Sequence, residues 1–202
     1  QMPAEKTAVR HAFELRIPSN AELVEMIQPN TSMRAVMART TAFAGLRLGE
    51  LCRLDWEDVD LEDRVIRVMG GPLRVIPLPP LLAGALREWN GTVSANRMNL
   101  VFPRRSGDVF SCRGLAAWFK GGGGLYARYP HLSLHRFFMI WCSAGLSDGR
   151  GGLTANQLAY LLGHRIPLNE EFVMYSSGYT PIDMDGYAAA ERAVFSSEKN
   201  LR

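Results

Sequence analysis

An arginine enclosed by apolar residues constrains this chain more than any other feature. Arg47 follows Gly45 and Leu46 within residues 41–60, a segment whose apolar positions have the spacing of a helix–turn–helix unit: Phe43, Leu46, Leu51, Leu54 and Trp56. A guanidinium keeps its proton in a protein, so among apolar side chains it needs a negative partner. The partner is either Glu50 or an external anion such as phosphate, which matches the planar fork. From the residues alone, an internal Arg47–Glu50 pair is the commoner arrangement.

The overall composition is typical of one globular domain. The chain has 202 residues, of which 47% are hydrophobic, enough for a sizeable core with at most a small appendage. Apolar runs are too short to span a membrane, and the N-terminus lacks the order of a signal peptide. We therefore expect an intracellular protein with no membrane partner.

The charge and the cysteines indicate which partners and which redox compartment suit this chain. The net charge of +3 permits a nucleic-acid partner without requiring one, and only Lys6, Lys120 and Lys199 are lysines among 23 basic residues. Such an arginine bias favours bidentate phosphate contacts, and it is equally typical of a GC-rich genome. The three cysteines stand in apolar company, which predicts buried thiols in a reducing compartment. Since no metal-ligand spacing occurs, we expect no metal and no cofactor.

The periodicity predicts a mainly α fold with a small antiparallel β-hairpin or sheet, an α+β class. Residues 64–68 and 73–78 alternate around Gly70-Gly71-Pro72, which predicts a hairpin with arginines on its exposed face. Helical segments are expected at residues 20–27, 32–44, 81–89, 111–120, 154–162 and 184–195. The four glycines at residues 121–124 predict a flexible loop. Residues 1–17 are expected to be an extension or linker, and residues 18–202 a domain.

The motifs of this chain resemble one known family. The run Ala-Gly-Leu-Arg-Leu-Gly-Glu-Leu at residues 44–51, leading into Leu-Asp-Trp-Glu-Asp-Val-Asp at 54–60, resembles the first arginine box of the tyrosine recombinases, the phage-integrase family. A basic hairpin, a histidine segment, Leu-Leu-Gly-His at 161–164 and a tyrosine follow in the family's order. The resemblance covers most of the chain and implies the integrase catalytic-domain fold. It also implies that the family's N-terminal core-binding domain is absent from this chain.

The resemblance implies roles for individual residues. Arg47 would hold the scissile phosphate, and His164 would hydrogen-bond a phosphate oxygen. Tyr175 would attack phosphorus and form a 3′-phosphotyrosyl bond, which needs neither metal nor ATP. Tyr179 is an alternative nucleophile, because the residues after it also resemble those that follow the family's tyrosine.

Two departures from the family pattern put catalysis in question. The family has His-x-x-Arg at the start of a buried helix, usually with a second His. Placing His135 on the first His puts Phe138 in the arginine position, whereas a shifted register makes Arg136 the second arginine and leaves Ser133 in the histidine position.

The second departure is in the hairpin, which lacks the lysine that acts in the family as general acid. Lys120 is a candidate replacement, and Arg67 and Arg74 are candidates for DNA contacts. Arginine itself is a poor proton donor because its pKa lies far above neutrality.

The expected function is therefore site-specific recombination or integration on double-stranded DNA, as for a mobile element, with activity reduced or lost. The alternative is an inactive protein of recombinase fold that binds DNA or a protein partner. The small-residue stripe of the last helix, Ala188, Ala189, Ala190 and Ala193, is expected to pack on its own domain or to mediate self-association on DNA.

Overall fold

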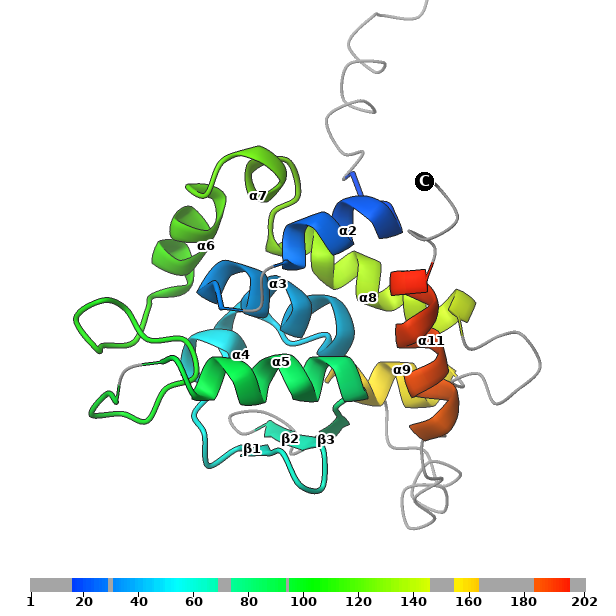
Figure 1. Ribbon diagram of the computed structural model, residues 1–202, viewed down its shortest axis with the longest axis horizontal. Helices are drawn as coiled ribbons and strands as arrows, with labels where there is room; N and C mark the ends of the chain where they lie inside the picture. The colour runs from blue at the N-terminus through cyan, green and yellow to red at the C-terminus, as the bar shows by residue number, and fades with distance from the viewer. Residues whose placement is uncertain are drawn as a thin grey trace, which may run out of the picture.

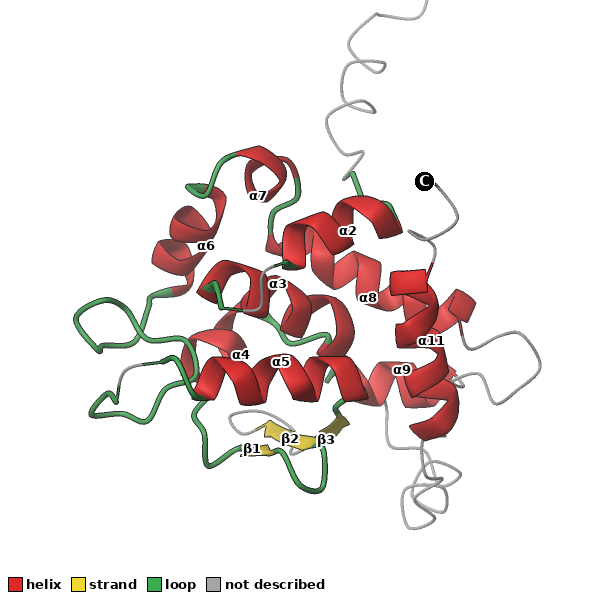
Figure 2. Ribbon diagram, viewed as in Figure 1, coloured by secondary structure: helices red, strands yellow, loops and turns green. Residues whose placement is uncertain are grey.

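The computed structural model describes residues 16–28, 31–68, 74–93, 95–145, 155–163 and 184–196. Most described residues are helical, and a small antiparallel sheet lies at one edge, as Figure 2 shows. The helices are α2 (Asn20–Ile27), α3 (Met33–Ala44), α4 (Leu48–Arg53), α5 (Pro80–Asn90), α6 (Cys112–Lys120), α7 (Gly124–Arg128), α8 (His131–Gly145), α9 (Ala155–Leu161) and α11 (Met184–Ser196). The strands are β1 (Val59–Asp60), β2 (Val65–Val68) and β3 (Arg74–Pro77).

Helix α3 forms the centre of the core. Its residues 35–44 are all buried, and it packs against α2, α5 and α8, which surround it in Figure 1. The buried hydroxyls of Thr40 and Thr41 donate to the carbonyls of Val36 and Met37, at 2.8 and 2.9 Å. A helix buried on all sides needs such internal partners, because an unpaired hydroxyl in the core is costly.

Gly45 ends α3 and sets the direction of the chain into the arginine box. Its φ of 63° lies in the left-handed region that glycine adopts without strain, and its backbone N–H donates to the Thr41 carbonyl. A Cβ at this position would lie 2.4 Å from the ring of Phe138 on α8. Glycine is therefore needed here both for the turn and for the close approach of α8.

The sheet confirms the predicted hairpin and adds a strand to it. The order is β1-β2-β3 with antiparallel pairing, in which Ile66 faces both Val59 and Ile76. The added strand, β1, has only two residues, too few for a periodic signal in the sequence. Arg67 is exposed, but Arg74 is 2% exposed, so the prediction that both lie on an exposed face is wrong for Arg74.

Two helices begin where the sequence pattern did not place them. Helix α7 starts at Gly124, inside the predicted glycine loop, and its Tyr126 hydroxyl donates to the Met26 carbonyl at 2.6 Å. Helix α8 starts at His131, immediately after Pro130 and four residues before His135. Helix α2 begins at a reciprocal capping box formed by Ser19 and Glu22.

The last helix, α11, packs against its own domain. The Tyr187 hydroxyl donates to the Phe43 carbonyl at 3.2 Å, and the Trp141 indole donates to the Ala190 carbonyl at 3.3 Å. The carboxylate of Glu191, fully buried, accepts the backbone N–H groups of Leu81 and Leu82, both at 2.8 Å. Glu191 thus caps the first turn of α5, whose N–H groups have no partner within that helix.

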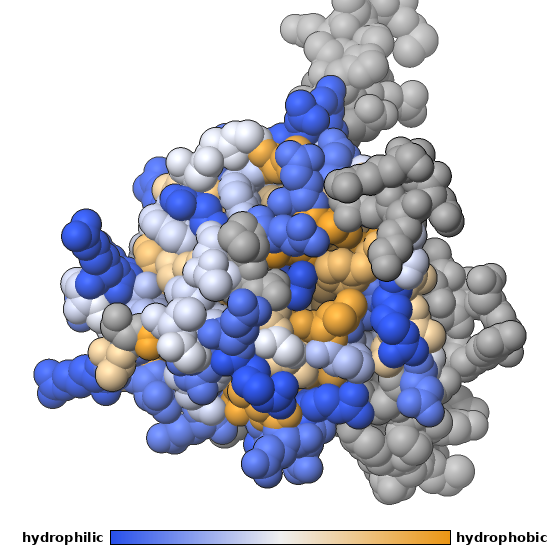
Figure 3. Space-filling model, in the orientation of Figure 1, coloured by the Kyte–Doolittle hydropathy of each residue, from blue (hydrophilic) through white to orange (hydrophobic). Residues whose placement is uncertain are grey.

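The surface is mainly polar in the orientation of Figure 3. Hydrophilic side chains cover most of this face, and an apolar area is visible where α2, α3, α5 and α11 meet. In the part of the chain that the structure describes, no helix combines the length and apolarity needed to cross a membrane.

We predict that Glu191→Gln reduces the pH dependence of stability. Burial raises the pKa of Glu191 from 4.5 to about 7, despite its two backbone donors and the nearby Arg39. Between these two pH values the folded state keeps a proton that the unfolded state has released, so stability falls as pH rises, by up to about 3 kcal/mol. Thermal unfolding from about pH 5 to about pH 8 measures this slope.

The variant Glu25→Gln, at an exposed position of α2, is the control and should reproduce the wild-type slope. An unchanged slope in Glu191→Gln would contradict the assignment of this titration to Glu191.

Candidate functional site

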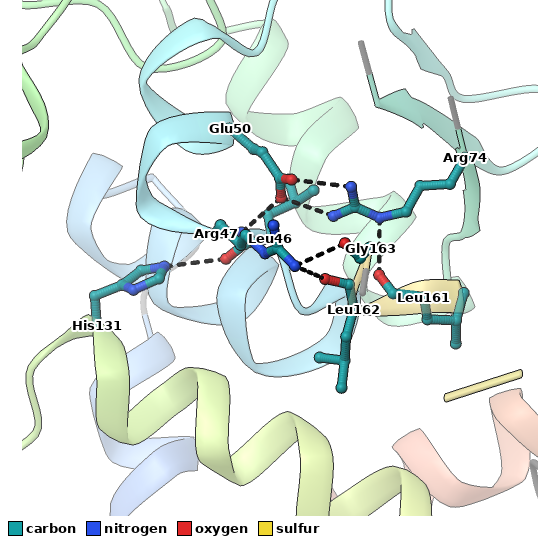
Figure 4. A network of polar contacts seen from close by, with 8 residues as sticks. All are labelled: Leu46, Arg47, Glu50, Arg74, His131, Leu161, Leu162 and Gly163. Carbon is teal, nitrogen blue, oxygen red and sulfur yellow. Dashed lines mark hydrogen bonds and ion pairs between the residues drawn. The ribbon is translucent and has the colours of Figure 1, made fainter. Parts of the chain in front are cut away.

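Arg47 stands exposed at the N-terminus of α4. Its backbone N–H donates to the Glu50 carboxylate at 2.7 Å, which caps the helix. Its guanidinium turns elsewhere, because Nη2 donates to the carbonyls of Leu162 and Gly163, at 2.7 and 2.8 Å (Figure 4). The prediction of an ion pair between the Arg47 guanidinium and Glu50, which the residues alone favoured, is therefore wrong.

The partner of Glu50 is Arg74 on β3. The two Nη atoms of Arg74 donate to the two carboxylate oxygens of Glu50, at 2.9 and 2.7 Å, and Arg74 Nε donates to the Leu161 carbonyl at 2.9 Å. This is a fork-to-fork arrangement, the strongest geometry for an arginine–carboxylate pair. It lets a guanidinium occupy a position that is 2% exposed.

The two arginines meet at the end of α9. The carbonyls of residues 161–163 lie at a helix C-terminus, where they lack partners within the helix and the helix dipole is negative. Gly163 has a φ of +63°, and a Cβ there would lie 2.7 Å from Nη1 of Arg74. The Tyr160 hydroxyl accepts the Val75 N–H at 3.0 Å, which ties α9 to β3. The chain leaving Gly163 is therefore tightly held at the residue before His164.

Three predicted site residues, His164, Tyr175 and Tyr179, lie outside the described residues. Their roles stay predictions.

His131 lies beside the arginine box, although the motifs in the sequence did not single it out. Its Nε2 lies 3.0 Å from the Leu46 carbonyl, one residue before Arg47, and its ring lies 6.1 Å from that of His135 with an interplanar angle of 19°. Burial lowers the pKa of His131 to about 4, so the ring is neutral near pH 7. A carbonyl only accepts, so the proton is on Nε2 and Nδ1 is left as an acceptor. Pro130 and the four-residue spacing to His135 are the signals that could have identified His131.

The start of α8 also changes the register of the histidine segment. With His131 on the first histidine of His-x-x-Arg-His, Leu134 takes the arginine position and His135 the second histidine. Leu134 is fully buried. Phe138 is also fully buried, beneath Gly45, and Arg136 is exposed on the face that carries the exposed Leu132 and Ile140. Within the described part of α8, no arginine faces Arg47.

The remaining predicted DNA contacts lie apart from this network. Arg67 is exposed and paired with Asp60 at 3.0 Å, and Lys120 is exposed at the last residue of α6. In the described part of the chain, the groups gathered at the site are therefore Arg47, His131, His135 and the Arg74–Glu50 pair.

Comparison with known proteins identifies the family. The phage integrase family matches residues 16–167, and the chain belongs to this family. The tyrosine recombinase XerC of Xanthomonas axonopodis pv. citri is 33% identical over 127 residues, which cover 60% of this chain and 39% of that protein. XerC of Xylella fastidiosa is also 33% identical over 127 residues and is covered to 41%. The chain therefore spans about two fifths of the length of these relatives.

Solved structures confirm the predicted fold. The XerA recombinase superposes with a TM-score of 0.63 at 19% identity, covering 82% of this chain and 66% of that one. The integrase from mycobacterium phage Brujita gives 0.59 at 18% identity, covering 87% and 56%. The Tn1549 transposon integrase, in complex with circular intermediate DNA, gives 0.58 at 18% identity, covering 84% and 61%. The mainly helical fold with its small antiparallel sheet is that of the tyrosine recombinases.

We predict that Arg74→Met destabilises the protein much more than Arg67→Met, its matched control on the same hairpin. Removing Arg74 leaves the Glu50 carboxylate without its buried partner, which costs about 3–5 kcal/mol and lowers Tm by roughly 10 °C. Arg67 is 45% exposed, so its variant should melt close to the wild type. Thermal denaturation followed by circular dichroism measures both.

The double variant Glu50→Leu with Arg74→Met tests the cause, because it removes the stranded charge and should recover part of the lost stability. Equal melting of the two single variants would show that the buried pair does not hold the site together.

Proposed function

We propose that this chain is a DNA-binding recombinase domain that breaks and rejoins double-stranded DNA through a 3′-phosphotyrosyl intermediate. The observation that carries the proposal is the exposed guanidinium of Arg47, held beside residues 161–163 and backed by the buried Arg74–Glu50 pair. Family membership and the similarity to recombinases and to a DNA-bound integrase support it. The catalytic domain would comprise residues 18–202, with residues 1–17 as a linker.

Arg47 is proposed to bind the scissile phosphate. Within the described part of the chain, its contacts to the carbonyls of Leu162 and Gly163 use only Nη2. Nη1 and Nε therefore remain for phosphate oxygens. Two carbonyls fix the plane of the guanidinium before the phosphate arrives, which removes part of the ordering cost of binding. His164, the next residue along the chain from Gly163, would donate to another phosphate oxygen.

Tyr175 is proposed as the nucleophile, with Tyr179 as the alternative. The phenol oxygen attacks phosphorus, the bond to the 5′ oxygen breaks, and the leaving oxygen takes a proton. His131 and His135 are proposed to help position the reacting groups beside Arg47, because a ring with a pKa of about 4, such as that of His131, is a weak proton acceptor. Lys120, exposed at the end of α6 and apart from the Arg47 network, is proposed to contact DNA rather than to replace the hairpin lysine as general acid. Arg136 and Arg67, both exposed, would contact the DNA backbone rather than the reacting phosphate.

We infer that catalysis is slower than in a site with two exposed arginines. Arg74 is occupied by Glu50, and Leu134 stands where the family pattern has its second arginine. Loss of one preorganised donor typically costs about 10²–10³ in rate. The buried Leu134 also favours the second candidate function, an inactive recombinase fold that binds DNA or a protein.

On DNA, copies of the chain are proposed to associate through α11. Ala189 and Ala193 are exposed on this helix, whereas Ala188 and Ala190 are buried against the domain. A protein that acts on DNA works in the compartment that holds the DNA, so this protein would be intracellular. A domain of this size that contacts DNA mainly through arginines should lose affinity steeply as salt rises.

A nicked suicide substrate tests the chemistry. The wild type should form a covalent complex that survives denaturation, Tyr175→Phe should abolish it, and Tyr179→Phe should retain it. Arg47→Ala should reduce the rate of trapping by roughly 10² or more. Trapping that persists in Tyr175→Phe and disappears in Tyr179→Phe would assign the nucleophile to Tyr179.

A mobility shift at low salt, on the same DNA, separates the two candidate functions. A shift without trapping in any variant would establish the inactive binder. The absence of both a mobility shift and covalent trapping would refute a role on DNA.

A further inference from the structure

Two cysteines that are distant in sequence lie together where α4 packs against α6. A Cβ on Gly49 would lie 3.6 Å from Sγ of Cys112, and Gly49 is one turn before Cys52 on the same face of α4. Cys112 is one of the groups that raise the pKa of the Cys52 thiol, as expected for two neighbouring thiols. The sulfur of Cys112 therefore lies over the face of α4 that carries Cys52.

The two thiols differ in their access to solvent. Cys112 is exposed, so the prediction that all three cysteines are buried is wrong for this one. Cys52 is 3% exposed and sits behind Cys112. Cys142, on α8, is fully buried and contacts Tyr187. Only the pair formed by Cys52 and Cys112 joins a surface thiol to a neighbouring buried one within the described residues.

We propose that Cys52 and Cys112 form a dithiol modification site, which a peroxide converts into an intramolecular disulfide linking α4 to α6. The site is independent of the proposed function on DNA, because its formation requires only the two sulfurs and the oxidant.

The chemistry proceeds in two balanced steps. The Cys112 sulfur attacks the peroxide O–O bond, which gives a sulfenic acid at Cys112 and one water. The Cys52 sulfur then displaces the sulfenic hydroxyl, which leaves as a second water with the Cys52 proton, so two thiols and one hydrogen peroxide give one disulfide and two waters. Burial and Cys112 raise the pKa of Cys52 to about 12, so Cys52 remains a thiol while the accessible Cys112 reacts first.

The bond would close a loop that contains the whole sheet and α5. Loops of this length restrict the unfolded chain strongly when they are closed, so the oxidised form should unfold at a higher temperature than the reduced form. The bond would also tether α4, whose first turn carries Arg47 and Glu50, to a second helix.

The test oxidises the complete wild-type chain with hydrogen peroxide and counts thiols after denaturation. Two of the three thiols should be lost. The monomer mass should fall by two hydrogens, peptide mapping should recover the Cys52–Cys112 link, and dithiothreitol should reverse all of these changes. Cys142→Ser should still form the link, whereas Cys52→Ser and Cys112→Ser should not, and these two should show no gain in Tm on oxidation.

Three outcomes would overturn the proposal, and each is read on the wild-type chain. They are retention of all three thiols under conditions that oxidise a small dithiol, a dimer bridged by Cys112 of two copies, and a disulfide that includes Cys142.

Discussion

The carboxylate of Glu50 is the group on which the arrangement of this site depends. It caps α4 through the backbone of Arg47 and pairs with Arg74, whose positive charge would otherwise be buried without a partner at 2% exposure. Arg74 in turn holds the end of α9 through the Leu161 carbonyl, 87 residues away in sequence. One acid thereby joins the turn after α3, the third strand and the segment before His164. The exposed Arg47 is positioned by this frame without being paired to an acid.

Two glycines let these segments approach one another. Gly45 and Gly163 each follow the end of a helix with a φ of 63°, and in both cases a Cβ would collide with a neighbour: Phe138 for Gly45 and Arg74 for Gly163. The chain thus turns sharply at the two points where it enters and leaves the site. Burial of Phe138 beneath Gly45 holds α8 against α3, and this packing brings His131 to the Leu46 carbonyl.

The sequence predicted the fold and the arginine box because both depend on local patterns. Helix caps, alternation and the words around Arg47 are readable over a few residues. The partner of Glu50 could not be predicted in this way. Alternation does not tell which face of the hairpin is covered, and therefore does not tell which of Arg67 and Arg74 is buried. Helix α8 starts four residues before His135, and this offset was not predicted. The two registers considered from the sequence therefore put Phe138 or Arg136 in the position of the second arginine, whereas in the structure Phe138 is buried in the core and Arg136 is exposed. His164, Tyr175 and Tyr179 lie outside the described residues, so the recombinase resemblance alone supports their roles.

The cap that Glu191 provides for α5 has a consequence for the order in which this chain can fold. The acceptor of the Leu81 and Leu82 N–H groups is Glu191, which lies 110 and 109 residues further along the chain. During synthesis, α3, the sheet and α5 all leave the ribosome before the residue that completes the first turn of α5 has been translated. Contacts of such long sequence separation carry a large loop-closure cost and form late. The core around α5 therefore stays incomplete until α11 docks, and addition of the last helix is the step that closes it.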